Sequence, residues 1–172
     1  MQTFVILFRG INVGGKNILP MKALVPILEK ANFKNIQYYI QTGNIILHAN
    51  NDPCAEIQIL VAKHFDFSPE IITLTEERFI KALQNCPYTK YEGKWVHFYF
   101  CKNNARLALD KIEKYQGDSE HYTLLNNVCY LYAPDGIGRS KFVANIELCL
   151  DTPATGRNLN TINKINSLLS TN

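Results

Sequence analysis

The order of the secondary-structure elements that the sequence predicts occurs twice along the chain, and this repetition limits the folds available to it. In residues 1–88 the apolar periodicity predicts strand, helix, hairpin, helix, strand and helix. In residues 89–172 it predicts strand, helix, hairpin and helix, followed by one further helix. Residues 85–93, NCPYTKYEG, separate the two patterns and are the best candidate for a linker.

A strand–helix–hairpin–helix order is typical of the split βαβ, or ferredoxin-like, fold. The sequence therefore predicts an α+β protein of two tandem ferredoxin-like units, residues 1–88 and 89–172, with an extra C-terminal helix. One larger α+β sheet with the same elements stays open as the alternative. The elements are expected at the buried strand 3–8, the helix 20–32, the hairpin 36–49, the helix from Pro53, the strand 69–74, the helix 75–83, the strand 95–101, the helix 103–115, the hairpin 121–133 and the helices 140–149 and 158–169.

Composition excludes several classes of protein. Hydrophobic residues make up 47% of the 172 residues and charged residues 19%, which a disordered chain does not have. No stretch is long and apolar enough to span a membrane, and the first residues lack the features of a signal peptide. Five widely spaced cysteines argue against a disulfide framework or a zinc site, so a cytoplasmic protein without a metal is expected. The net charge of +3 permits a polyanionic partner without requiring one.

The Gly-rich segment 10–17, GINVGGKN, lies between the first strand and the first helix and matches the phosphate-loop pattern G-x-x-x-x-G-K. Asn17 stands where that pattern needs a hydroxyl for magnesium, which argues against ATP or GTP hydrolysis. A weaker anion site remains, because glycines let main-chain amides approach a ligand closely. Arg9 and Lys16 flank these glycines, and no acidic residue occurs before Leu28. A solvated loop whose glycines only make turns is the alternative.

The last predicted helix carries the second candidate site. On a helix, Leu159 and Ile162 lie on the buried side, whereas Arg157, Thr161 and Lys164 lie largely on the other side. Short polar residues are poor helix formers, so contact with an anion is one reason for their presence here. The alternative is that these residues accumulated at exposed positions without a function.

The tip of the first predicted hairpin is a third candidate. It contains Gly43 and Asn44, and residues of these types at such tips mostly serve to make the turn. If the tip lies beside the Gly-rich segment, its amides add hydrogen-bond donors to the anion site.

The sequence assigns no catalytic residue. It contains no G-x-S-x-G or H-E-x-x-H motif, and no Cys–His arrangement or pair of carboxylates is recognisable, so whether the chain is an enzyme stays open. The aromatic residues of the predicted strands favour core packing over an RNA-binding face, because the consensus of RNA-binding strands is missing. His97 and His121 lie on predicted strands of the second half, and whether they face each other is also open.

Three separated segments carry a family resemblance: the opening FVILFRGINVGGKNILPMKAL, the hairpin segment YIQTGN and the segment TGRNLNTI. Together they resemble a bacterial family of domains of unknown function, family number 1697, over nearly the whole chain. Leu159 departs from the family, which commonly has an aromatic residue there. The resemblance implies a cytosolic α+β protein with two related subdomains and implies no activity. It points to Arg9, Gly10, Asn12, Gly14, Gly15, Gly43, Asn44, Arg157 and Asn158.

The leading hypothesis is a small cytosolic protein that binds a phosphate- or carboxylate-bearing ligand, with no cofactor identified. The Gly-rich segment would supply amides and cations, and the last helix would close the site. A nucleic-acid-binding module and a dimerising interaction protein without catalysis are the alternatives. The candidate ligand-binding residues are Arg9, Asn12, Gly14, Gly15, Lys16, Gly43, Asn44, Arg157, Asn158, Thr161 and Lys164.

Overall fold

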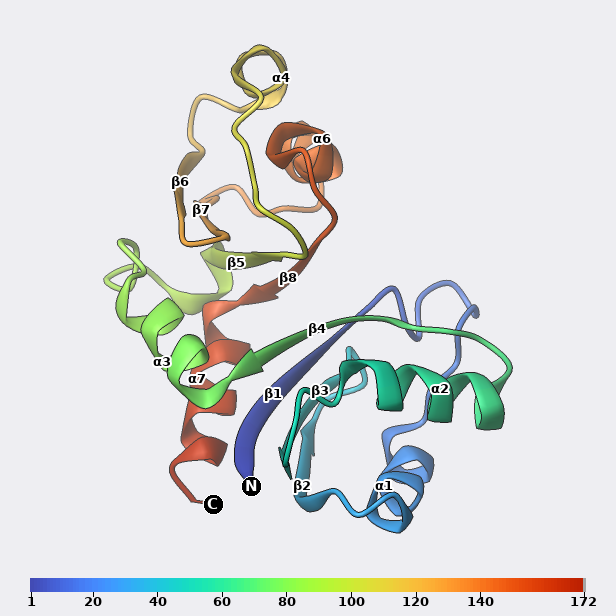
Figure 1. The fold of residues 1–172 in the computed structure, drawn as a ribbon. Helices are drawn as coiled ribbons and strands as arrows, with labels where there is room; N and C mark the ends of the chain where they lie inside the picture. The colour runs from blue at the N-terminus through green and yellow to red at the C-terminus, as the bar shows by residue number, and fades with distance from the viewer. Residues whose placement is uncertain (172) are drawn as a thin grey trace. The chain divides into compact units, whose positions relative to one another are not determined.

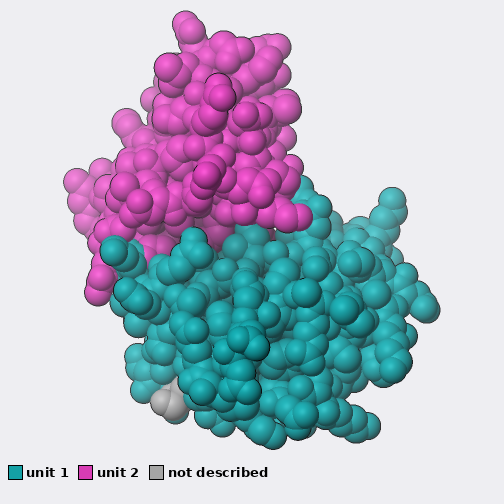
Figure 2. All heavy atoms as spheres, viewed as in Figure 1, with its two compact units in different colours: residues 1–81, 164–172 teal, residues 82–163 magenta. Residues whose placement is uncertain are grey.

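The chain divides into two compact units in a computed structural model that describes residues 1–171 (Figure 2). Unit 1 consists of Met1–Lys81 and the chain from Lys164 onward, and unit 2 consists of Ala82–Asn163. The divisions therefore fall within two helices, α3 (Glu76–Gln84) and α7 (Leu159–Leu169). The sequence places the boundary after residue 88 and the last helix wholly in the second half, and these domain limits stay a prediction.

Unit 1 contains a four-stranded antiparallel sheet with the strand order β2-β3-β1-β4. Helices α1 and α2 lie on the same side of this sheet (Figure 1). The elements of unit 1 before α3 are β1 (Gln2–Arg9), α1 (Met21–Lys30), β2 (Lys34–Tyr39), β3 (Asn44–Ala49), α2 (Cys54–Phe65) and β4 (Glu70–Thr75).

The central strand β1 is buried on both faces. Phe4, Ile6 and Phe8 belong to the core that also contains side chains of α1 and α2. Val5 and Leu7, which point to the opposite face because strand side chains alternate, are fully buried as well. A strand buried on both faces is a continuous apolar run rather than an alternating one, so the prediction from TFVILF is confirmed.

Unit 2 contains a second four-stranded antiparallel sheet, with the strand order β6-β7-β5-β8. Its core combines alternate residues of β5 and β7 with Ile112 of α4, Phe142 of α5 and Cys149 of α6. The elements before α7 are η1 (Gly93–Trp95), β5 (Val96–Cys101), α4 (Leu109–Tyr115), β6 (His121–Leu125), β7 (Val128–Tyr132), α5 (Lys141–Ala144), α6 (Ile146–Leu150) and β8 (Ala154–Asn158).

The assignment of Arg157 to the last helix is wrong, because Ala154–Asn158 form the edge strand β8. Gly156 and Asn158 are residue types that strands usually lack, so local propensity does not indicate a strand. Pairing with β5, which lies far upstream in the sequence, supplies the hydrogen bonds instead. Arg157 therefore lies on a strand, whereas Thr161 and Lys164 lie on α7, as the sequence predicts.

Two predicted helices of the second half are shorter than expected. Residues 103–108 are not helical, since the amides of Arg106 and Ala108 donate to Leu150 O and Cys149 O at 3.0 and 2.9 Å. The helix expected at 140–149 is split into α5 and α6 at Asn145, whose side-chain amide donates to Lys141 O at 2.8 Å and competes with the helical bonding there.

Turn signals in the sequence identify both hairpins. Asn126 and Asn127 have φ of 50° and 62°, as a type I′ turn between β6 and β7 requires. In the first hairpin the turn lies at residues 40–43, and Asn44 is the first residue of β3. None of the helices among residues 1–171 is long and apolar enough to cross a membrane.

Candidate functional site

The Gly-rich segment of unit 1 forms a miniature hairpin. The Lys16 amide donates to Val13 O at 3.1 Å, and the two residues form an antiparallel bridge. Gly14 and Gly15 between them have φ of 58° and 71°, which defines a type I′ turn. The segment is therefore no phosphate loop, because the Lys16 amide is bonded within the turn and is not available to a phosphate group.

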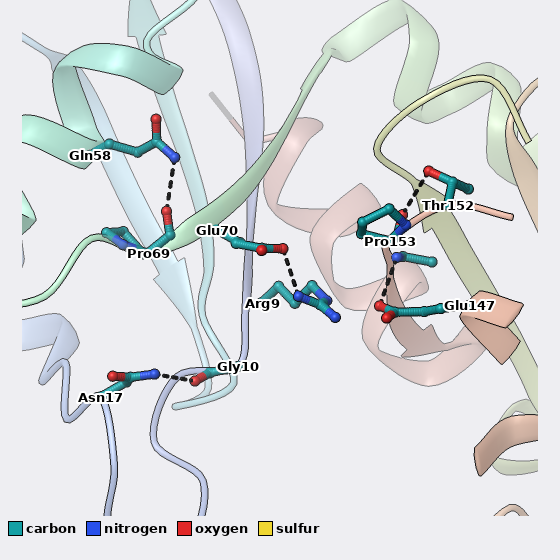
Figure 3. A network of polar contacts seen from close by, with 10 residues as sticks. Arg9, Gly10, Asn17, Gln58, Pro69, Glu70, Glu147, Thr152 and Pro153 are labelled. Carbon is teal, nitrogen blue, oxygen red and sulfur yellow. Dashed lines mark hydrogen bonds and ion pairs between the residues drawn. The ribbon is translucent and has the colours of Figure 1, made fainter. Parts of the chain in front are cut away.

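Asn12 holds this Gly-rich hairpin (residues 12–17) against the tip of the first hairpin. Its side-chain amide donates to Gln41 O at 2.7 Å and to Leu19 O at 3.1 Å. Its side-chain oxygen accepts from the Leu19 amide at 2.8 Å. A further bond joins the Asn17 side chain to Gly10 O at 3.2 Å (Figure 3). The Gly-rich hairpin and the tip of the first hairpin therefore lie side by side within unit 1.

Gly43 and Asn44 stabilise the tip of the first hairpin. The Gly43 carbonyl accepts from the Phe8 amide at 2.9 Å, and Gly43 itself is buried. Asn44 is 2% exposed, and its side-chain amide donates to Tyr39 O at 2.9 Å. These contacts are structural, and ligand contact by either residue stays a prediction.

The turn of the Gly-rich hairpin carries hydrogen-bond donors that bind no other group among the described residues. Among residues 1–171, the amides of Gly14 and Gly15 and the ammonium group of Lys16 have no hydrogen-bond or ion-pair partner. All three residues are exposed. Three hydrogen-bond donors without a protein partner therefore lie on one four-residue turn.

Arg9 is compensated, which corrects the expectation that the positive charges of this region lack acidic neighbours. Its guanidinium donates to Glu70 Oε2 at 2.6 Å (Figure 3). The two residues are cross-strand partners of β1 and β4. Both side chains are partly exposed, so the pair contributes at most about 1 kcal/mol. Glu70 was missed because it is remote in the sequence and adjacent only through the antiparallel register.

Arg157 is a buried residue of β8, not an exposed residue of the last helix. It is 8% exposed and lies opposite Phe98 of β5. Its guanidinium donates to Thr155 Oγ1 and to Gly156 O, each at 2.8 Å. Burial lowers the pKa of Arg157 to about 10, at which the side chain is still charged at neutral pH.

The remaining C-terminal candidates surround the start of α7. Asn158 caps this helix, because its side-chain oxygen accepts from the Thr161 amide at 2.9 Å. Thr161 is buried, whereas Lys164 is exposed. Capping explains why a short polar residue stands at this helix start, and ligand contact by the three residues stays a prediction. Convergence of this set with the Gly-rich hairpin also stays a prediction.

The segment expected to be a linker covers the aromatic face of the unit 2 sheet. Tyr91 stacks on Tyr132 of β7 with ring centroids 3.9 Å apart, and the Tyr88 hydroxyl lies 3.0 Å from Thr123 Oγ1. The Tyr130 hydroxyl donates to Ala82 O at 2.7 Å. The chain thus packs on aromatic residues that an RNA-binding sheet would keep open, which supports the interpretation as core packing.

His97 and His121 do not face each other. His97 lies opposite Leu131 of β7, whereas His121 lies opposite the next residue, Tyr132, so the two rings are on opposite faces of the sheet. His97 is 7% exposed, and its Nε2 atom is buried without a hydrogen-bond partner in residues 1–171. No group of three or more potential metal ligands is found in this part of the chain.

Acidification is expected to destabilise the fold through His97. Burial lowers the pKa of His97, and a hydrogen bond with the Lys94 backbone opposes this effect. Below about pH 6.5, the ordinary pKa of histidine, the unfolded chain takes up a proton that the folded chain excludes. Stability is therefore present above that pH and is lost as the pH falls toward the lowered value, which urea unfolding at a series of pH values measures.

Two variants separate this effect from general acid denaturation. His97→Phe should reduce the loss of stability below about pH 6.5, because no group then titrates at this position. His64→Gln, which replaces an exposed histidine, should keep the loss unchanged. The same pH dependence in His97→Phe and in the unmodified chain would contradict the assignment.

Comparisons with known proteins give a family and a fold. A family model described as "Protein of unknown function (DUF1697)" matches residues 1–130. Among solved structures, the conserved bacterial protein SP0830 from Streptococcus pneumoniae is similar, with a TM-score of 0.74, 22% sequence identity and 98% of each chain covered. At that identity the likeness shows the fold alone. No match was found among curated proteins.

Proposed function

The chain belongs to the DUF1697 family, whose description gives no activity, and we propose from its own geometry that it binds a small ligand bearing a phosphate or carboxylate group. The ligand contacts the turn of the Gly-rich hairpin in unit 1. The single observation that carries this proposal is the presence of three unused donors, the amides of Gly14 and Gly15 and the ammonium of Lys16, on one turn.

The rigidity of the Gly-rich hairpin supports the proposal. Gly10, Asn12, Gly14, Gly15 and Asn17 all have positive φ, a conformation that asparagine and glycine tolerate best. Asn12 uses both polar atoms of its side chain to fix the hairpin to two other segments. A rigid scaffold lowers the entropy lost when a loop contacts a ligand, whereas a merely solvated loop needs no such bonds.

The C-terminal candidates are a weaker part of this proposal. Arg157 is buried and bonded within β8, Asn158 caps α7, and Thr161 is buried. Lys164 is the exposed member of the set and is the one available to a ligand.

We further propose that each unit is ferredoxin-like, which its element order and sheet support. Free cysteines support a cytoplasmic location.

Replacing Lys16 with Gln tests the binding site. We expect Lys16→Gln to weaken binding of inorganic phosphate or acetate about tenfold or more, because the positive charge that strengthens the hydrogen bond to the anion is lost. NMR titration at constant ionic strength measures this through the amide signals of Gly14 and Gly15. Lys22→Gln is the matched control, since it removes one exposed lysine on α1 and should leave the affinity nearly unchanged.

Other outcomes of this titration favour the alternatives. If neither anion moves the two glycine signals at millimolar concentration, the proposal is wrong. A response only to single-stranded RNA that disappears at high salt would favour a nucleic-acid-binding module.

The exposed aliphatic residues Val13, Ile18 and Ile40, which are 68%, 53% and 41% exposed, favour self-association as the second candidate. Sedimentation at two protein concentrations detects it.

A further inference from the structure

Unit 2 contains a cavity of about 540 Å³ that is widely open to solvent, between residues 106–111, at the start of α4, and residues 147–153, at the end of α6. None of the candidate site residues of the sequence lines it. Its volume lies in the range of about 300–1,000 Å³ that is typical of small-molecule sites. The cavity lies within one unit, and it shares no residue with the Gly-rich hairpin.

Three hydrogen bonds join the two walls of the cavity. The amides of Arg106 and Ala108 donate to the carbonyls of Leu150 and Cys149. The Asn103 amide donates to Thr152 Oγ1 at 3.1 Å. Because these bonds fix the main chain of both walls, the cavity exists without a ligand and little ordering of the main chain is needed when one binds.

Two side chains of opposite charge in the lining of this cavity have no partner among the described residues. Among residues 1–171 the Arg106 guanidinium and the Asp151 carboxylate have no hydrogen-bond or ion-pair partner. Arg106 donates its amide to Leu150 O, so it lies across from the residue that precedes Asp151. The cavity therefore offers one cation and one anion from adjacent positions of its two walls.

The other charged groups of the lining have partners. Glu147 Oε1 accepts from the Ala154 amide at 3.0 Å, so this carboxylate fixes the start of β8 (Figure 3). Lys111 lies 3.8 Å from Asp110 in an exposed pair. A ligand with a single charge would meet only one of the two unused groups, whereas a zwitterion meets both.

Apolar side chains line the rest of the cavity. The apolar side chain of Leu148 is 58% exposed, and Ala108 and Pro153 also line the cavity. An aliphatic group placed against Leu148 removes apolar surface from water. We propose that this cavity binds a free amino acid with an aliphatic side chain, whose carboxylate contacts Arg106 and whose ammonium group contacts Asp151.

Calorimetric titration with L-leucine and two analogues tests the proposal. We expect L-leucine to bind at least about tenfold more tightly than 4-methylpentanoate, which lacks the ammonium group, and than isoamylamine, which lacks the carboxylate. Arg106→Gln should weaken L-leucine binding about tenfold and leave isoamylamine unchanged. Asp151→Asn should weaken L-leucine binding and leave 4-methylpentanoate unchanged.

Control variants keep the test independent of folding and of the Gly-rich hairpin. Arg139→Gln and Asp118→Asn replace exposed residues of unit 2 outside the cavity lining and should leave binding intact. Lys16→Gln should also bind L-leucine normally, so failure of the anion site and of this site are distinguishable. No binding of L-leucine, equal binding of either analogue, or affinities in Arg106→Gln and Asp151→Asn that match these controls would each overturn the proposal.

Discussion

Gly43→Ala is expected to lower the free energy of unfolding by about 2–5 kcal/mol, the sum of about 1–2 kcal/mol for a left-handed backbone and about 1–3 kcal/mol for overpacking. Gly43 has φ of +86°, which an L side chain rarely adopts. A Cβ atom there would lie 2.6 Å from Ile11 Cδ1 and 2.7 Å from Phe8 Cβ, and both of these side chains are buried. Urea unfolding measures the difference.

Two glycine variants separate backbone strain from steric overlap. Gly10 has φ of +68° and open space where a Cβ would be added. Gly10→Ala should therefore lower the free energy of unfolding by the backbone strain alone, about 1–2 kcal/mol. Gly138→Ala has open space and no positive φ, so its stability should change by less than about 1 kcal/mol. If Gly43→Ala costs no more than Gly10→Ala, the close approach of the tip to β1 is not what requires a glycine at this position.

Gly156→Ala is expected to lower the free energy of unfolding by about 1–3 kcal/mol through overpacking in unit 2. The added Cβ would lie 2.7 Å from Cε1 and 3.1 Å from Cδ1 of the Tyr99 ring. Tyr99 is 6% exposed, so the ring has little room to move away. Thermal or urea unfolding checks this value, and Gly138→Ala is again the control.

A second substitution shows whether the ring is the cause. Tyr99→Leu removes Cε1, the ring atom nearest the added Cβ, so Gly156→Ala should cost less in the Tyr99→Leu background than in the unmodified chain. The difference is the coupling energy of the double-mutant cycle. Additive effects of the two substitutions would show that the strand, and not the ring, requires the glycine.

Local sequence patterns predict the elements whose structure depends on local interactions. The apolar run of β1, the periodic helices α1 and α2 and the Asn126-Asn127 turn are found where the sequence predicts them. Strand β8 was missed because its pairing with β5 decides its conformation and its own residues do not favour a strand. The α+β class depends on the local elements and is confirmed.

The turns of the candidate site could be predicted for the same reason. The pattern of glycines and asparagines identifies the turns, and their proximity within unit 1 follows from the pairing of β1 with β3. The partners of the arginines could not be predicted, because Glu70 is adjacent to Arg9 only through the register of β4. The burial of Arg157 likewise follows from its place on β8, which the sequence does not indicate.

Unit 1 is built from two separate segments of the chain, and this has a consequence for the order in which the two units are synthesised. Unit 2 is formed by one continuous segment, whereas unit 1 needs residues from both sides of it. On the ribosome, every residue of unit 2 has therefore been added before the last segment of unit 1 is made. In most multidomain proteins the N-terminal domain is completed first during translation. Here residues 1–81 of unit 1 are synthesised before unit 2, and the segment of α7 that completes unit 1 is synthesised only after the whole of unit 2.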